Sequence, residues 1–189
     1  VNNNPANPVI NDRSFGEDRE LVARKAIAYM RGLQDGGVIA TAKHFPGHGD
    51  TDVDSHLGLP LIAQTRARLD SLELYPFERM VSEGLAAMMV GHLEVPALDS
   101  TRGLPSTLSR PIVNGVLERE LGFKGLVFTD ALNMKGVAKA DKPGEIELRA
   151  LLAGNDVLLF PQDPAGAIAR IRQAVDSGEV PVERIDHSC

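Results

Sequence analysis

The chain has 189 residues and a formal net charge of −6, with 43% hydrophobic and 24% charged residues. This composition is ordinary for a globular protein and excludes collagen, coiled coils and wholesale disorder. The single cysteine, Cys189, excludes a disulfide framework and a zinc site built only of thiolates. Mild acidity without a basic block argues against nucleic acid as a partner. The longest apolar run, residues 85–90, is far shorter than the roughly 20 residues that span a membrane.

Along the chain, short apolar runs alternate with longer amphipathic stretches. The apolar runs predict buried strands over 38–42, 86–90, 126–129 and 157–160. The amphipathic stretches predict helices over 18–35, 66–83, 111–121, 145–153 and 164–177. Buried strands that alternate with helices indicate an α/β fold whose parallel sheet is covered on both faces. The polar, proline-rich residues 1–8 fit a linker or frayed terminus, or a loop whose preceding strand lies before residue 1.

Polar residues gather directly after the predicted strands, which is where parallel α/β folds build their sites. Residues 43–56 hold three His, three Asp and one Lys in a loop rich in Gly and Pro. Asp130 follows the third strand and His92 follows the second. Asp130 fits a reactive carboxylate and the N-cap of a following helix equally well. His92 is more readily interpreted as a hydrogen-bonded His at the rim of the sheet than as a ligand.

Three kinds of chemistry compete for the loop. Calcium would use Asp50, Asp52 and Asp54 at positions 1, 3 and 5 of an EF-hand, but Ser55 and Leu61 replace its Gly and Glu. A transition metal would use His44, His48 and His56, although they lack a fixed metal-ligand spacing. Acid/base catalysis would use a His held by a neighbouring carboxylate, with Asp54 and His56 two residues apart and Asp130 as nucleophile.

Three motifs, in this order along the chain, resemble those of glycoside hydrolase family 3. They are Asn11-Asp12-Arg13-Ser14-Phe15-Gly16, the loop from Lys43-His44-Phe45-Pro46-Gly47-His48 to Asp54-Ser55-His56, and Thr129-Asp130-Ala131-Leu132-Asn133-Met134. More narrowly, the motifs resemble those of the family's NagZ-type β-N-acetylglucosaminidases, or β-N-acetylhexosaminidases. The resemblance covers essentially the whole chain.

The resemblance implies a (β/α)8 barrel and a retaining exo-hydrolase that removes terminal β-linked N-acetylglucosamine in cell-wall muropeptide recycling. By position, Asp130 is the expected nucleophile, His56 the acid/base and Asp54 the residue that orients His56. Arg13, Lys43 and His44 are the expected sugar contacts. Neither a cofactor nor a metal is implied. Because a His acid/base repels an anionic acceptor less than a carboxylate does, we hypothesise that phosphate competes with water as acceptor.

A complete (β/α)8 barrel takes about 250 residues, so 189 residues suggest an incomplete one. We expect residues 1–189 to be the C-terminal two-thirds of the family's N-terminal catalytic barrel, without its first βα units. Four strands cannot close an eight-stranded barrel. The 189-residue chain alone is therefore expected to be inactive or poorly folded.

Two alternative functions stay open at this stage. One is a family 3 β-glucosidase or β-xylosidase, and the other is an inactive sugar-binding remnant of the barrel. The expected partner is a carbohydrate, such as an N-acetylglucosamine-containing glycan or muropeptide, with no nucleic acid and no membrane span. Localisation is undetermined because any targeting segment would precede residue 1. Among the alternatives we favour the cytoplasm over secretion or the periplasm.

Overall fold

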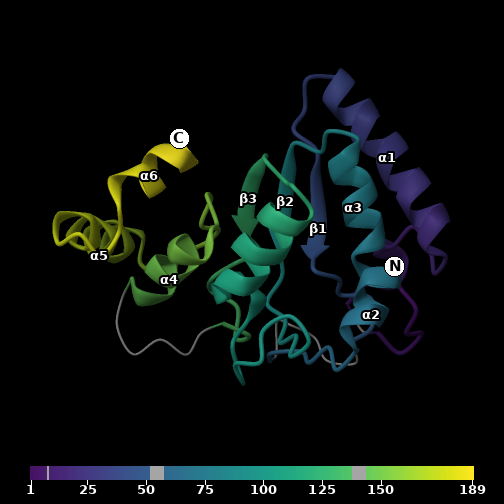
Figure 1. The fold of residues 1–189 in the computed structure, drawn as a ribbon, viewed down its shortest axis with the longest axis horizontal. Coiled ribbons are helices and arrows are strands. Elements are labelled where there is room, and N and C mark those ends of the chain that lie inside the picture. The colour runs from purple at the N-terminus through teal and green to yellow at the C-terminus, as the bar shows by residue number, and fades with distance from the viewer. Residues whose placement is uncertain (8, 52–57, 138–143) are drawn as a thin grey trace.

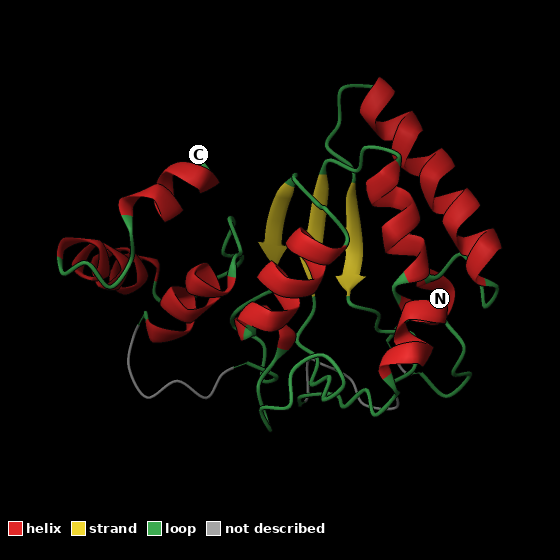
Figure 2. Ribbon diagram, viewed as in Figure 1, coloured by secondary structure: helices red, strands yellow, loops and turns green. Residues whose placement is uncertain are grey.

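The computed structural model describes residues 1–7, 9–51, 58–137 and 144–189. Three parallel strands form one sheet in the order β1-β2-β3, with helices beside and in front of it (Figures 1 and 2). The strands are β1 (Thr41–Phe45), β2 (Ala87–Val90) and β3 (Leu126–Thr129). The α-helices are α1 (Arg19–Asp35), α2 (Arg66–Arg68), α3 (Tyr75–Ser82), α4 (Glu145–Ala153), α5 (Pro164–Asp176) and α6 (Val182–Ser188). The remaining helices are the 3-10 turns η1 (Asn11–Arg13) and η3 (Ser106–Leu108) and the π-helices η2 (Leu69–Glu73) and η4 (Pro111–Glu120).

The register of the sheet places the carboxyl ends of the three strands at one edge. Thr41 lies opposite Ala87 in the β1–β2 pair, and Ala87 lies opposite Leu126 in the β2–β3 pair. The visible arrowheads of β1 and β3 in Figure 1 accordingly point the same way. Side chains that follow Phe45, Val90 and Thr129 therefore meet at this edge, as is usual for sites in parallel sheets.

Helix α1 shows how the local sequence sets an element and its buried face. The side chain of Asp18 accepts a hydrogen bond from the N–H of Leu21 at 2.7 Å and so caps the first turn. Apolar side chains at helical spacing, Val22, Ala26 and Met30, form its buried stripe. The chain leaves the helix through Gly36 and Gly37, the second of which has a φ of 78° that suits glycine.

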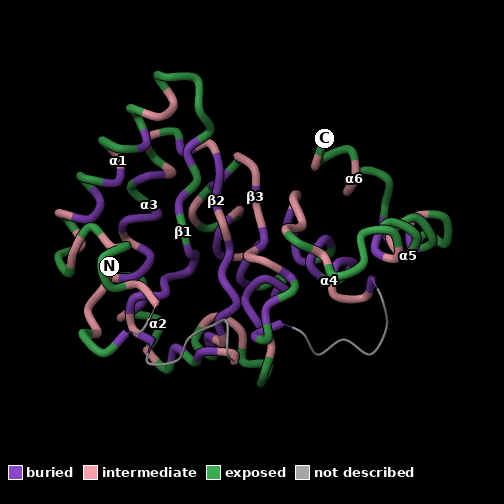
Figure 3. Tube along the Cα trace, turned by 180° about the vertical axis from the view of Figure 1, so that it is seen from behind, coloured by how far each residue is buried: buried purple, intermediate pink, exposed green. Residues whose placement is uncertain are grey.

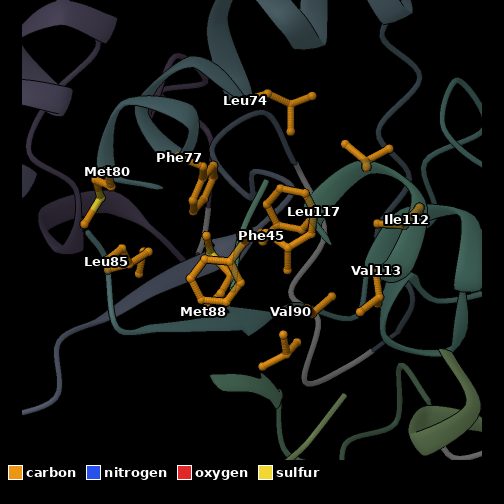
Figure 4. Close-up of a cluster of buried hydrophobic side chains, with 14 of the residues drawn as sticks. Phe45, Leu74, Phe77, Met80, Leu85, Met88, Val90, Ile112, Val113 and Leu117 are labelled. Atoms are coloured by element: carbon orange, nitrogen blue, oxygen red, sulfur yellow. The ribbon is translucent and has the colours of Figure 1, made fainter. Parts of the chain in front are cut away.

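The main core lies between the sheet and the helices α1, α3 and η4. Phe45 at the end of β1 is completely buried, and its ring meets that of Phe77 edge-on at 5.4 Å between centroids. Met88 from β2 and Leu117 from η4 belong to the same cluster (Figure 4). In Figure 3 the buried residues run along β2, whereas the outer side of α1 is exposed. Packing of this kind stabilises by about 25 cal/mol for each Å² of apolar surface removed from water.

The predicted α/β fold with a parallel sheet is confirmed, but two strand predictions need correction. Residues 38–40 precede β1, which begins at Thr41 opposite Ala87, although the carbonyl of Ala40 still accepts a hydrogen bond from the N–H of Ala87 at 3.1 Å. Val38 and Ile39 are accordingly 55% and 58% exposed. The run 157–160 forms only a bridge between Phe128 and Val157. Beyond that bridge, the N–H of Leu159 donates to the hydroxyl of Thr129 instead of to a backbone carbonyl.

All five predicted helices are present, with one interruption. The predicted helix over 66–83 consists of α2, η2 and α3, since a π-helical turn at 69–73 separates two α-helical pieces. The last three helices, α4 to α6, lie together on the side of the molecule away from α1 (Figure 1). The buried residues Leu148, Leu151, Ala174 and Val180 hold them together. Among the described residues, no helix is long and apolar enough to cross a membrane.

Candidate active site

Asp130 lies at the carboxyl edge of the sheet, immediately after β3. Its backbone N–H donates to the carbonyl of Val90 at 2.8 Å, which fixes the residue against β2. Its Oδ1 accepts a hydrogen bond from the N–H of Ala131 at 2.9 Å. The side chain is 15% exposed. The carboxylate is therefore held in one orientation while part of it stays accessible.

The alternative interpretation of Asp130 as a helix N-cap is wrong. Residues 131–137 contain turns and no helix. The next helix, α4, begins at Glu145 and is preceded by Gly144. The side chain of Asp130 thus caps no helix among the described residues.

His44 faces Asp130 from β1. Its Nε2 lies 3.8 Å from Oδ2 of Asp130, and its side chain is only 8% exposed. Burial lowers the pKa of His44 to about 3, an effect that the negative charge of Asp130 opposes and that His48, Lys43 and Arg13 reinforce. The imidazole is consequently neutral near pH 7, so the contact is not an ion pair under those conditions. Its Nδ1 is buried and has no hydrogen-bond partner among the described residues.

Lys43 and Arg13 gather on the same side of the molecule as His44. All three line a cavity of about 240 Å³ between β1, α1, α3 and the start of the chain. The floor of this cavity is apolar and includes Ala42 and Phe77. Lys43 and Arg13 are exposed, and both lower the pKa of His44 through their positive charge. The structure therefore brings the three predicted sugar contacts to one cavity, and His44 is the one that contacts Asp130.

Asp54 and His56 lie outside the described residues. The part of their loop that is described, Pro46 to Thr51, is mostly buried. His48 is 3% exposed, and its Nδ1 lies 2.9 Å from Oγ1 of Thr51. Its ring meets the ring of His44 edge-on at 5.7 Å between centroids.

The two metal interpretations of the loop depend partly on residues outside the described ones. For calcium these are Asp52 and Asp54, and for a transition metal it is His56. The side chain of Asp50 accepts a hydrogen bond from Nε2 of Gln64 at 2.7 Å. Within the described part of the chain, no group of three or more His, Cys, Asp or Glu side chains is placed to hold a metal ion.

The asparagine-rich opening of the chain is neither frayed nor a linker. Asn7 is 1% exposed, and its Nδ2 donates to the carbonyl of His48 at 2.8 Å and to Oγ1 of Thr51 at 3.3 Å. Its Oδ1 accepts from the N–H groups of Val9 and Ile10, each at 2.9 Å. Sequence reasoning missed this residue, although the asparagine cluster beside the Arg13 motif was a usable signal.

His92 is a buried His with hydrogen bonds from both ring nitrogens, which confirms its interpretation as a satisfied residue. Its Nδ1 lies 2.8 Å from Oγ1 of Thr107, and its Nε2 lies 3.0 Å from the carbonyl oxygen of Ala131. It is completely buried. It therefore contacts the residue that follows Asp130.

Sequence reasoning also missed Glu73, a buried acid in η2. It is 1% exposed, and its Oε1 accepts a hydrogen bond from Nη2 of Arg68 at 3.1 Å. Burial raises the pKa of Glu73, against the opposing charge of Arg68. It lies under the His/Asp loop, since a Cβ on Gly47 would come within 2.8 Å of the Cβ of Glu73.

The family model of the glycosyl hydrolase family 3 N terminal domain matches residues 1–189. The chain belongs to glycosyl hydrolase family 3. It is 41% identical over 159 residues to a beta-hexosaminidase from Nitrosospira multiformis, covering 84% of this chain and 45% of that protein. The chain spans less than half the length of the curated relatives that it matches.

Solved structures of family 3 proteins superpose closely on the chain. A glycoside hydrolase family 3 β-N-acetylglucosaminidase from Paenibacillus sp. str. FPU-7 is 46% identical with a TM-score of 0.95, covering all of this chain and 36% of that one. A second structure, of the beta-glucoside phosphorylase BglX, is 28% identical with a TM-score of 0.93, covering all of this chain and 35% of that one. These similarities support the α/β fold and the family 3 assignment.

Proposed function

We propose that the full-length protein is a retaining exo-β-N-acetylglucosaminidase in which Asp130 is the nucleophile. The observation that carries the proposal is the Asp130 carboxylate, fixed at the carboxyl edge of the sheet and facing a neutral imidazole. The 46% identity to a β-N-acetylglucosaminidase supports the same substrate class. The resemblance to family 3 further supports placing the sheet in a (β/α)8 barrel, whose sites lie at the carboxyl ends of the strands.

In the first step, a carboxylate oxygen of Asp130 attacks the anomeric carbon of the terminal sugar. The bond from that carbon to the leaving oxygen breaks, and protonated His56 gives its proton to the leaving alcohol. The product is a glycosyl ester on Asp130. Asp54 orients His56 in this scheme, in the way a neighbouring carboxylate fixes an imidazole tautomer.

In the second step, neutral His56 takes a proton from water, and the water oxygen attacks the anomeric carbon of the ester. The carbon–oxygen bond to Asp130 breaks, which releases the sugar and regenerates the carboxylate and protonated His56. Two inversions at the same carbon give net retention.

Neutral His44 suits a position beside the nucleophile. An imidazolium at 3.8 Å would stabilise the free carboxylate and so oppose its attack, whereas a neutral ring does so far less. His44 lines the same cavity as Lys43 and Arg13, as a sugar-contact role requires. Lys43 and Arg13 add charged donors for hydroxyl or carbonyl oxygens of the substrate. We propose muropeptides of the bacterial cell wall as the natural substrate class.

Replacing Asp130 by Ala tests the nucleophile and the substrate class together. The full-length protein and its Asp130→Ala variant are assayed on a chromogenic β-N-acetylglucosaminide and on the matching β-glucoside. We expect hydrolysis of the first substrate only, and its loss in the variant. Preference for the β-glucoside would instead support the β-glucosidase alternative. Binding of N-acetylglucosamine without turnover of either substrate would support the inactive remnant.

The acceptor of the glycosyl group is tested separately. With a His as acid/base, phosphate is expected to compete with water and give some sugar 1-phosphate when phosphate is added to the assay. Product analysis with and without phosphate measures this. Absence of sugar 1-phosphate at high phosphate would limit the proposed reaction to hydrolysis.

A further inference from the structure

A chain of buried polar side chains runs through the interior behind Asp130. Its members, His92, Thr107 and Asn155, are each 0% exposed. They come from three segments: the residues after β2, the turn η3 and the turn after α4. A buried polar group is costly unless it is hydrogen-bonded. The hydrogen-bond partners of these three side chains therefore identify the backbone groups that the network fixes.

The contacts of His92 determine which ring nitrogen carries the proton. The carbonyl oxygen of Ala131 can only accept, so Nε2 of His92 must donate to it across the 3.0 Å contact. In the neutral ring, Nδ1 then accepts from the hydroxyl of Thr107 at 2.8 Å. Thr107 is fixed in turn, because Nδ2 of Asn155 donates to its carbonyl at 2.8 Å and also to the carbonyl of Ala150 at 2.7 Å.

The peptide groups on both sides of Ala131 connect this network to the nucleophile. The N–H of Ala131 donates to Oδ1 of Asp130 at 2.9 Å, while its carbonyl accepts from His92. Movement of residue 131 would therefore release the carboxylate from one of its hydrogen bonds. Asp130 has a second fixed point in its own N–H, which donates to Val90. The bond to Val90 thus fixes the backbone of Asp130 before its side chain, and His92 fixes the peptide group that follows it.

We propose that His92 is a positioning residue for the nucleophile, acting through Ala131, and that Thr107 holds the His92 ring in the orientation that this requires. The inference rests on the proposed role of Asp130. His92 acts on the carboxylate through an N–H placed one residue away from it. Attack on the anomeric carbon depends on the orientation of the carboxylate, because a displacement of about 1 Å at a reacting group costs on the order of 100-fold in rate.

Substitutions at Thr107 test the proposal with the least disturbance to packing. In the full-length protein, Thr107→Val keeps the shape and removes the hydroxyl, whereas Thr107→Ser keeps the hydroxyl and removes a methyl group. We expect Thr107→Val to lower kcat by about 10- to 100-fold with KM changed by less than about threefold. Thr107→Ser is expected to retain most of the activity. Equal kcat values for the two variants, measured on folded protein, would overturn the proposal.

Substitutions at His92 extend the test to the donor itself. His92→Phe removes both hydrogen bonds, while His92→Gln offers an amide N–H as a replacement donor. We expect kcat to fall in the order wild type, His92→Gln, His92→Phe. Wild-type kcat in folded His92→Phe would overturn the proposal. If His92→Phe does not fold, the Thr107 pair decides the outcome.

Two controls separate positioning from general stability and from failure of the proposed function. Ser109 is also completely buried, and its Oγ bonds Asp99 and the N–H of Ile112, away from Ala131. Ser109→Ala is therefore expected to lower Tm and leave kcat unchanged. An equal loss of kcat in Ser109→Ala and Thr107→Val would overturn the positioning role. Full activity of Asp130→Ala would instead reject the proposed function on which this inference rests.

Discussion

Nε2 of His44 lies 3.8 Å from Oδ2 of Asp130, across the carboxyl edge of the sheet from β1 to β3. Burial keeps this imidazole neutral near pH 7, since it lowers the pKa of His44 to about 3. The proposed nucleophile therefore has an uncharged imidazole as its neighbour.

The buried His44 should make the folded state sensitive to acid. Its pKa is about 3 when folded and 6.5 in the unfolded reference, so the unfolded chain binds the extra proton as pH falls below 6.5. The free energy of unfolding should then fall by up to about 1.4 kcal/mol per pH unit from this group. His44→Gln lacks this contribution, so denaturant unfolding should show its stability gap to wild type narrowing from pH 7 to pH 4. A gap independent of pH would contradict the burial argument.

Lys43 and Arg13 should contribute to substrate binding through charge-assisted hydrogen bonds. Such bonds are worth about 1.5–3 kcal/mol each, so Lys43→Met should lower kcat/KM by about 10- to 100-fold. Arg13→Met should act in the same direction. Lys25 on α1 is also exposed but lies outside the cavity lining, which makes Lys25→Met the matched control. Equal kcat/KM values for Lys43→Met and Lys25→Met would remove Lys43 from the site.

Asn7 should anchor the described part of the His/Asp loop through its two donor contacts to His48 and Thr51. Asn7→Asp keeps an acceptor for the N–H groups of Val9 and Ile10 but loses the donors. It also places a carboxylate against the carbonyl oxygen of His48. Chemical denaturation should therefore show a loss of about 2–4 kcal/mol, at least as large as for Asn7→Ala. Unchanged stability in Asn7→Asp would show that these contacts do not hold the loop.

Phe45 should be among the most sensitive core positions, because its ring is completely buried and contacts Phe77. Phe45→Ala should lower the free energy of unfolding by about 3–5 kcal/mol, and Phe45→Leu by less. The exposed Tyr29, at 64%, provides a comparison in which substitution by Ala should cost much less. Similar losses at the two positions would contradict the location of the core.

Much of the fold could be predicted from the sequence because its signals are local. The spacing of Val22, Ala26 and Met30 indicates one face of a helix without any knowledge of its neighbours. The start of β1 depends on its partner, since pairing begins where Thr41 meets Ala87, 46 positions away in the chain. Apolar residues 38 and 39 could not reveal that no strand lies beside them.

In the candidate site, too, some residues have local sequence signals and others depend on contacts with distant parts of the chain. Asp130 and the His/Asp loop could be found from their residue types and their place after apolar strands. For Asn7 the asparagine cluster was a signal, but it did not indicate a role, which comes from contacts with His48 and Thr51, 41 and 44 residues away. The link from His92 to Asp130 likewise depends on a contact to Ala131 that spans 39 residues. Only the folded chain brings these groups together.

A covalent intermediate on Asp130 tests the central claim most directly. The full-length protein is incubated with a fluorinated N-acetylglucosaminyl fluoride, which forms the glycosyl ester quickly and releases it slowly. Mass spectrometry of peptides should then locate one added sugar on Asp130, and Asp130→Ala should carry none. A sugar attached to another carboxylate, or an equally labelled Asp130→Ala variant, would contradict the assignment of Asp130 as the nucleophile.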